Sequence, residues 1–134
     1  MKDADDYLAY VKALIVANPQ VIGWKVLREE TQGDIGLFRW RIIFHDGSLL
    51  EMFERFQVVG EKLQVTKYRF HWQDAAGRLL KRWDNAAHHP EIVTNPNHVH
   101  EGSEENVRSH EPLSAEEVLA IMVANRLPLL HLFQ

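Results

Sequence analysis

Five of the eight histidines lie close together in the sequence, at positions 88, 89, 98, 100 and 110. Imidazole titrates near neutral pH, so it can act as a base, an acid or a cation within one site. In an extended segment, the side chains of His98 and His100 would project from the same side. That arrangement suits either chelation of a metal ion or proton transfer at a phosphodiester.

Three interpretations of this histidine cluster stay open. In the leading one, one imidazole gives a proton to the leaving oxygen of RNA and another takes a proton from the nucleophile, with no cofactor or metal. In the second, His98 and His100 chelate a metal together with His88 or His89, as in a metal-dependent hydrolase. In the third, the histidines are exposed loop residues in a non-catalytic protein-binding module.

Basic residues come directly before the histidines. Residues 62–82 contain six basic residues and one acid, whereas residues 84–117 contain eight acids and one basic residue. The contrast indicates either two solvated faces of opposite charge or a local cationic surface for a polyanion. We expect the chain that leaves residues 79–84 to pass the basic strands, which would bring cations beside imidazoles.

This expectation defines the candidate site. Asp84 would orient a histidine by accepting its ring N–H. The predicted phosphate-binding residues are Arg69, Lys81 and Arg82. The predicted acid–base residues are His71, His88, His89, His98 and His100.

The elements that would position these residues form an α+β domain spanning residues 1–134. Helical spacing of apolar residues predicts a helix over 4–17, and a capping box at Ser114 and Glu117 begins a second helix over 114–126. Alternating patterns predict an antiparallel meander of four or five strands between them, over residues 21–30, 37–44, 49–59, 63–73 and 79–84. Residues 85–112 are predicted to be a long histidine-rich loop.

Composition excludes several classes of protein. The chain has no cysteine, which excludes disulfide frameworks and thiolate metal sites. A net charge of −4 argues against a general nucleic-acid coat. No apolar run is long enough to span a bilayer and the N-terminus lacks a signal-peptide core, so we expect a cytoplasmic protein. The apolar tail at 129–133 is expected to pack on the sheet or on a partner chain.

The sequence resembles the TumE family, the toxin components of small toxin–antitoxin modules, over residues 5–126. The resemblance implies a growth-inhibiting protein whose partner is a helix-turn-helix antitoxin. The expected partners are that antitoxin, RNA at the histidine site and a second copy in a homodimer, with no membrane. Ala87 and Asn97 depart from the family pattern. The likeness is carried by Tyr68-Arg69-Phe70-His71-Trp72-Gln73-Asp74, Arg82-Trp83-Asp84-Asn85-Ala86, His88-His89-Pro90-Glu91, His98-Val99-His100 and Glu105-Asn106-Val107.

Overall fold

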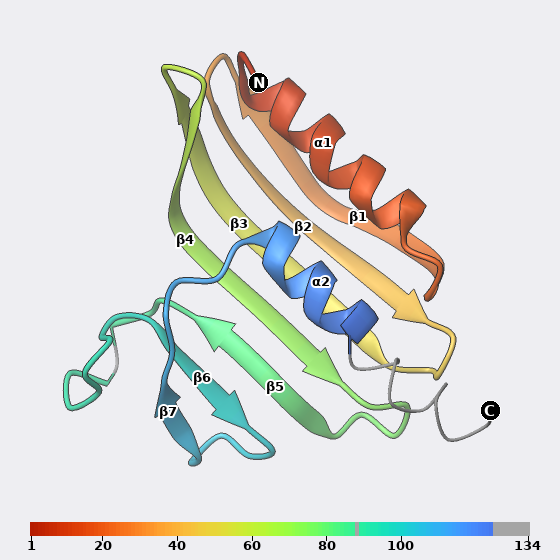
Figure 1. The fold of residues 1–134 in the computed structure, drawn as a ribbon, viewed down its shortest axis with the longest axis vertical. Coiled ribbons are helices and arrows are strands. Elements are labelled where there is room, and N and C mark those ends of the chain that lie inside the picture. Colours follow the sequence, from red (N-terminus) through yellow and green to blue (C-terminus); the bar gives the residue numbers. More distant parts are fainter. Residues whose placement is uncertain (88, 125–134) are drawn as a thin grey trace.

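The structure is a computed structural model that describes residues 1–87 and 89–124, in which two helices and seven strands are found (Figure 1). The predictions for His88 and for the apolar tail at 129–133 fall outside the described residues. Within the described part, neither helix is long and apolar enough to cross a membrane. In chain order the elements are α1 (Ala4–Ala17), β1 (Val21–Gln32), β2 (Ile35–Phe44), β3 (Leu49–Val59), β4 (Lys62–Gln73), β5 (Leu79–Asp84), β6 (His98–Glu101), β7 (Val107–Ser109) and α2 (Ala115–Ala124).

All seven strands belong to one sheet, in which each strand pairs antiparallel with the next along the chain. Both helices lie against the same face of this sheet, and the opposite face has no helix over it among the described elements (Figure 1). The predicted α+β class, with a helix before and after an antiparallel meander, is confirmed. The predicted count of four or five strands was too low.

Helix α1 begins and ends at residues that satisfy its free backbone groups. The Asp3 carboxylate accepts the backbone N–H of Asp6 at 2.9 Å, which caps the N-terminus. At the other end, the N–H of Asn18 donates to the carbonyl of Ile15 at 3.2 Å. Its buried side packs on the sheet and consists of Ala4, Tyr7, Leu8, Val11 and Ile15.

The core lies between the helices and the sheet. A row of cross-strand neighbours runs through it from β2 to β6, and each of its side chains is at most 2% exposed. Because successive side chains of a strand point to opposite faces, the neighbours of these residues point to the face without a helix. The row consists of Trp40, Met52, Phe70, Trp83 and Val99.

A buried carboxyl group on β3 joins both helices to the sheet. The hydroxyl of Tyr7 on α1 donates to Glu54 at 2.5 Å, and the first backbone N–H of α2, at Ala115, donates to Glu54 at 3.0 Å. Burial raises the pKa of Glu54 to about 7. The two hydrogen bonds lower this pKa, but their effect is smaller than that of burial. The predicted capping box of α2 is confirmed by reciprocal bonds between Ser114 and Glu117.

The prediction of a long loop over residues 85–112 is wrong in part, because this segment contains two further strands. β6 pairs with β5 and β7 pairs with β6, so residues 98–101 and 107–109 extend the meander. These strands are only four and three residues long, and Val99 is their one buried apolar residue. Such short strands carry no alternating pattern that sequence reasoning could detect.

Candidate functional site

Two rows of mostly polar side chains cross the open face of the sheet. Residues two apart on a strand share a face, so the register of the strands decides which distant residues meet. The first row of cross-strand neighbours is Arg39, Phe53, Arg69, Asp84 and His98. The second row, two residues along each strand, is Glu51, His71, Arg82 and His100.

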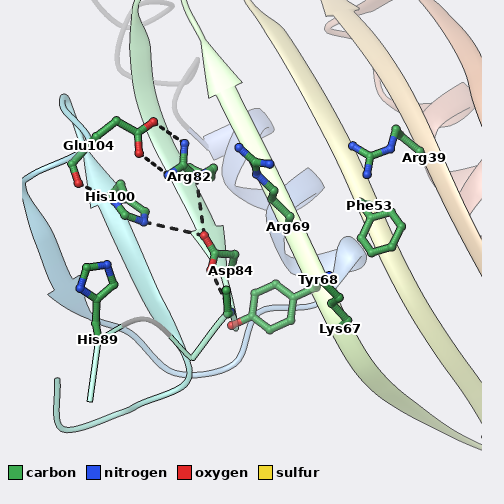
Figure 2. A pocket seen from close by; sticks show the side chains of 11 residues that line it. Arg39, Phe53, Lys67, Tyr68, Arg69, Arg82, Asp84, His89, His100 and Glu104 are labelled. Atoms are coloured by element: carbon green, nitrogen blue, oxygen red, sulfur yellow. Dashed lines mark hydrogen bonds and ion pairs between the residues drawn. The ribbon is translucent and has the colours of Figure 1, made fainter. Parts of the chain in front are cut away.

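These rows border a pocket of about 530 Å³. Figure 2 shows its two sides, with the side chains of Arg39 and Arg69 across from those of His89 and His100. Four cationic side chains line it against two carboxylates, so the pocket is basic on a protein whose net charge is negative. The lining residues are Arg39, Phe53, Lys67, Tyr68, Arg69, Arg82, Asp84, Ala86, His89, His100 and Glu104.

Three imidazoles meet at one side of the pocket, and we call them the histidine trio: His89, His98 and His100. Their ring centroids lie 4.9 to 5.8 Å apart. One ring nitrogen from each lies within 4.8 Å of the others. The side chains of His98 and His100 are 1% and 6% exposed, whereas that of His89 is 28% exposed.

Each ring of the trio has its Nδ1 against a group that only accepts hydrogen bonds. Nδ1 of His98 lies 2.8 Å from the carbonyl of Pro96, and Nδ1 of His100 lies 2.9 Å from the carbonyl of Glu104. Nδ1 of His89 lies 3.1 Å from the carboxylate of Glu91. Because carbonyl and carboxylate oxygens cannot donate, Nδ1 carries the proton in all three rings, and a neutral ring has its lone pair on Nε2.

Asp84 lies at the base of the trio. Its carboxylate oxygens lie 3.1 Å from Nε2 of His98 and 3.8 Å from Nε2 of His100. The same carboxylate accepts the backbone N–H of Ala86 at 2.9 Å, which fixes its orientation. Asp84, predicted to orient one histidine ring, therefore lies against two rings.

The environment of His100 favours its neutral form. Burial lowers the pKa of His100, and the positive charge of Arg82 lowers it further. The carbonyl of Glu104 and the charge of Asp84 act in the opposite direction. A neutral imidazole with a free Nε2 can accept a proton or bind a metal.

Arg82 is held by partners and is not free for substrate. Its guanidinium forms two hydrogen bonds with the carboxylate of Glu104 and lies 3.6 Å from Asp84. The hydrogen bond from Arg82 lowers the pKa of Glu104 to about 2, so this carboxylate stays charged at neutral pH. In contrast, Arg69 and Lys67 form no hydrogen bond or ion pair through their side chains within the described part of the chain.

The structure does not bring every predicted residue into the pocket. His71 lies in a neighbouring hollow of about 260 Å³, together with Arg39 and Arg69. Lys81 is the cross-strand partner of Trp72 and has its Nζ 5.9 Å from the ring of Trp83, so it lies on the face with the helices. Lys81 and Arg82 are successive residues of β5, so their side chains point to opposite faces of the sheet.

Several pocket residues were not predicted. Lys67 alternates with Tyr68 and Phe70, and Arg39 alternates with Phe38 and Trp40, so the period-2 pattern indicates their face. Their position beside the histidines depends on strand register, which that pattern does not determine. Glu104 belongs to the turn between β6 and β7, and no sequence signal pairs it with Arg82.

The fold and the pocket define an α+β protein with a basic, imidazole-lined hollow on an open sheet face. The family model described as Toxin TumE matches residues 11–126. The chain therefore belongs to the TumE toxin family and has a toxin role, as the resemblance of its sequence implied. No curated protein and no solved structure matches it.

Proposed function

We propose that this toxin binds RNA in the pocket and cleaves a phosphodiester bond there. One observation carries the proposal: Arg69 and Lys67, which have no ion-pair partner among the described residues, share a pocket with His89 and His100. Phosphodiester cleavage needs cations for the phosphate oxygens and groups that move protons on either side of the phosphorus. The pocket supplies both.

The proposed reaction uses the 2′-hydroxyl of the RNA as nucleophile. Nε2 of His100 accepts the proton of that hydroxyl while the 2′-oxygen–phosphorus bond forms. The bond from phosphorus to the 5′-oxygen breaks, and protonated His89 gives that oxygen a proton. The products are a 2′,3′-cyclic phosphate and a free 5′-hydroxyl.

Each side chain has a role that matches its surroundings. His89 is the most exposed ring of the trio, and its Nδ1 lies 3.1 Å from the carboxylate of Glu91. Arg69 and Lys67 hold the non-bridging oxygens and stabilise the charge that develops on them. Asp84 and the buried His98 position His100. Arg82 stabilises the wall of the pocket through its ion pair with Glu104.

The proposed biological setting follows from the family. A toxin of this kind is controlled by an antitoxin, and we infer a helix-turn-helix protein encoded beside it as that partner. The proposed site of action is the cytoplasm, where RNA is accessible. A homodimer remains a further proposed assembly, tested by the mass of the purified protein in solution.

The test compares His89→Ala and His100→Ala with His45→Ala, a control in an exposed turn between β2 and β3. Purified toxin is incubated with a defined RNA, and the ends of the fragments are identified. We expect cyclic-phosphate fragments from the unaltered protein and from His45→Ala, and none from the two trio variants, whose folding is checked by circular dichroism. Full cleavage by the trio variants would overturn the proposal.

A non-catalytic protein-binding module remains the competing function. It predicts that the trio variants still arrest growth when expressed without antitoxin. Growth assays of the same three variants therefore separate the two functions, because only a catalytic toxin loses toxicity with its imidazoles.

A further inference from the structure

We infer that the histidine trio, His89, His98 and His100, binds a divalent transition metal ion. One ring nitrogen from each residue lies within 4.8 Å of the other two. The rings come from different segments, His89 from the chain after β5 and the other two from β6. Imidazole nitrogen is the most common protein ligand for such ions.

The hydrogen bonds of the three rings orient them so that Nε2 of each ring can bind an ion. All three Nδ1 atoms are engaged by oxygen acceptors at 2.8 to 3.1 Å, so Nε2 is the atom of each ring that can bind an ion, and in His98 it lies 3.1 Å from the Asp84 carboxylate. Metal-binding histidines usually donate their other ring N–H to a carbonyl or carboxylate, which fixes both tautomer and orientation. Here this arrangement occurs three times in one cluster.

A positive charge would also stabilise the contact between His98 and Asp84. With its proton on Nδ1, neutral His98 places a lone pair on Nε2, 3.1 Å from a carboxylate oxygen. Two acceptors at this distance repel one another unless a proton or a cation lies between or beside them.

The donor set selects the class of ion. Three imidazole nitrogens beside a carboxylate suit Zn²⁺, Co²⁺ or Ni²⁺, whereas Mg²⁺ and Ca²⁺ prefer oxygen ligands. Three protein ligands leave a fourth position of a tetrahedral ion for water, as catalytic zinc sites do. His89 and His100 line the pocket that Arg69 and Lys67 also border, so an ion bound to these two rings would lie beside that pocket.

The binding site stands without RNA cleavage, but its part in the reaction rests on the proposed function. An ion on the trio would use the three Nε2 lone pairs, so His100 would no longer be the base and His89 no longer the acid. Water on the ion would lose its proton near neutral pH, and the resulting hydroxide would accept the proton of the 2′-hydroxyl. The bonds to phosphorus that form and break would be the same, and the 5′-oxygen would take its proton from the water formed on the ion.

The experiment is zinc titration of untagged protein that has been treated with chelator, followed by isothermal calorimetry. We expect one ion per chain, and visible absorption bands of tetrahedral cobalt when Co²⁺ replaces zinc. His89→Ala and His100→Ala should each weaken binding about 100-fold or more. His71→Ala is the matched control, since His71 lies on the same face outside the trio, and it should bind as the unaltered protein does.

His89 is partly exposed, so its variant keeps the test informative if replacing a buried histidine prevents folding. The inference is overturned if no ion binds, or if His89→Ala and His71→Ala bind equally well. Cleavage of RNA by metal-free protein that binds no zinc would overturn this inference and leave the proposed function intact. Stoichiometric zinc without any cleavage would support the metal site and overturn the proposed function.

Discussion

At the scale of single residues, charge and burial separate the side chains that shape the pocket from those that can meet a ligand. Arg82 and Arg69 are both arginines on the open face, one strand apart. Arg82 is 8% exposed and bound to Glu104 and Asp84, whereas Arg69 has no hydrogen-bond or ion-pair partner for its side chain among the described residues. Residue type alone predicts the same phosphate-binding role for both.

We predict that Arg82→Met lowers the free energy of unfolding by about 2 kcal/mol, because it leaves the buried Asp84 without its cation. Arg69→Met is the matched control and should change stability little. Urea unfolding followed by circular dichroism measures both. Equal stability of the two variants would contradict the assignment of Arg82 as a structural residue.

Glu54 gives a prediction on pH. Its folded pKa of about 7 lies above the ordinary value of 4.5, so the folded protein binds the proton more tightly than the unfolded chain does. The stability that protonated Glu54 contributes is fully present below pH 4.5 and is lost as pH rises through about 7. Over this range, the free energy of unfolding of the unaltered protein should fall by roughly 3 kcal/mol relative to that of Glu54→Gln, since one pKa unit corresponds to 1.36 kcal/mol.

Urea unfolding of both proteins at a series of pH values measures this difference. Because all other groups are shared, their contributions to the pH dependence cancel. A difference that stays constant from pH 4 to pH 8, or that grows in favour of the unaltered protein, would contradict the assignment.

At the scale of elements, the long helices and strands were predictable and the short strands were not. Helix α1 has the predicted bounds because Asp3 and Asn18-Pro19 mark its ends, and β3 follows its apolar alternation. β6 carries a single buried apolar residue, Val99, between two buried histidines. Imidazoles that are buried by contacts with Asp84 and one another look like loop residues in a sequence.

The packing of β2 against β3 predicts the effect of a single methyl group. A Cβ on Gly36 would lie 2.6 Å from the ring of Phe56, which is 1% exposed and packs edge-on against Tyr7 at 4.6 Å. Because this buried ring would have to shift within the packed core, Gly36→Ala should destabilise the protein by about 1–3 kcal/mol.

Gly23→Ala in β1 is the control, since a Cβ there meets no atom within 4 Å. Chemical denaturation of the two variants provides the comparison. A Gly36→Ala variant as stable as Gly23→Ala would show that the ring of Phe56 does not confine this position.

At the scale of the whole molecule, the sheet separates a core face from a chemical face. The helices cover the first, and the second gathers residues from five strands into two rows because the register aligns them. Sequence reasoning selected histidines and Asp84 as candidate site residues but could not determine this register. It also placed Lys81 beside Arg82, although alternation along β5 sends the two side chains to opposite faces.

The most direct test of the central claim uses these two faces. Arg69→Gln and Lys81→Gln remove the same charge from neighbouring strands, one inside the pocket and one on the face with the helices. We predict that Arg69→Gln slows single-turnover RNA cleavage about 100-fold, as loss of one oxyanion-stabilising donor does, while Lys81→Gln cleaves at the unaltered rate. Equal rates for the two variants would contradict the claim that this pocket holds the phosphate.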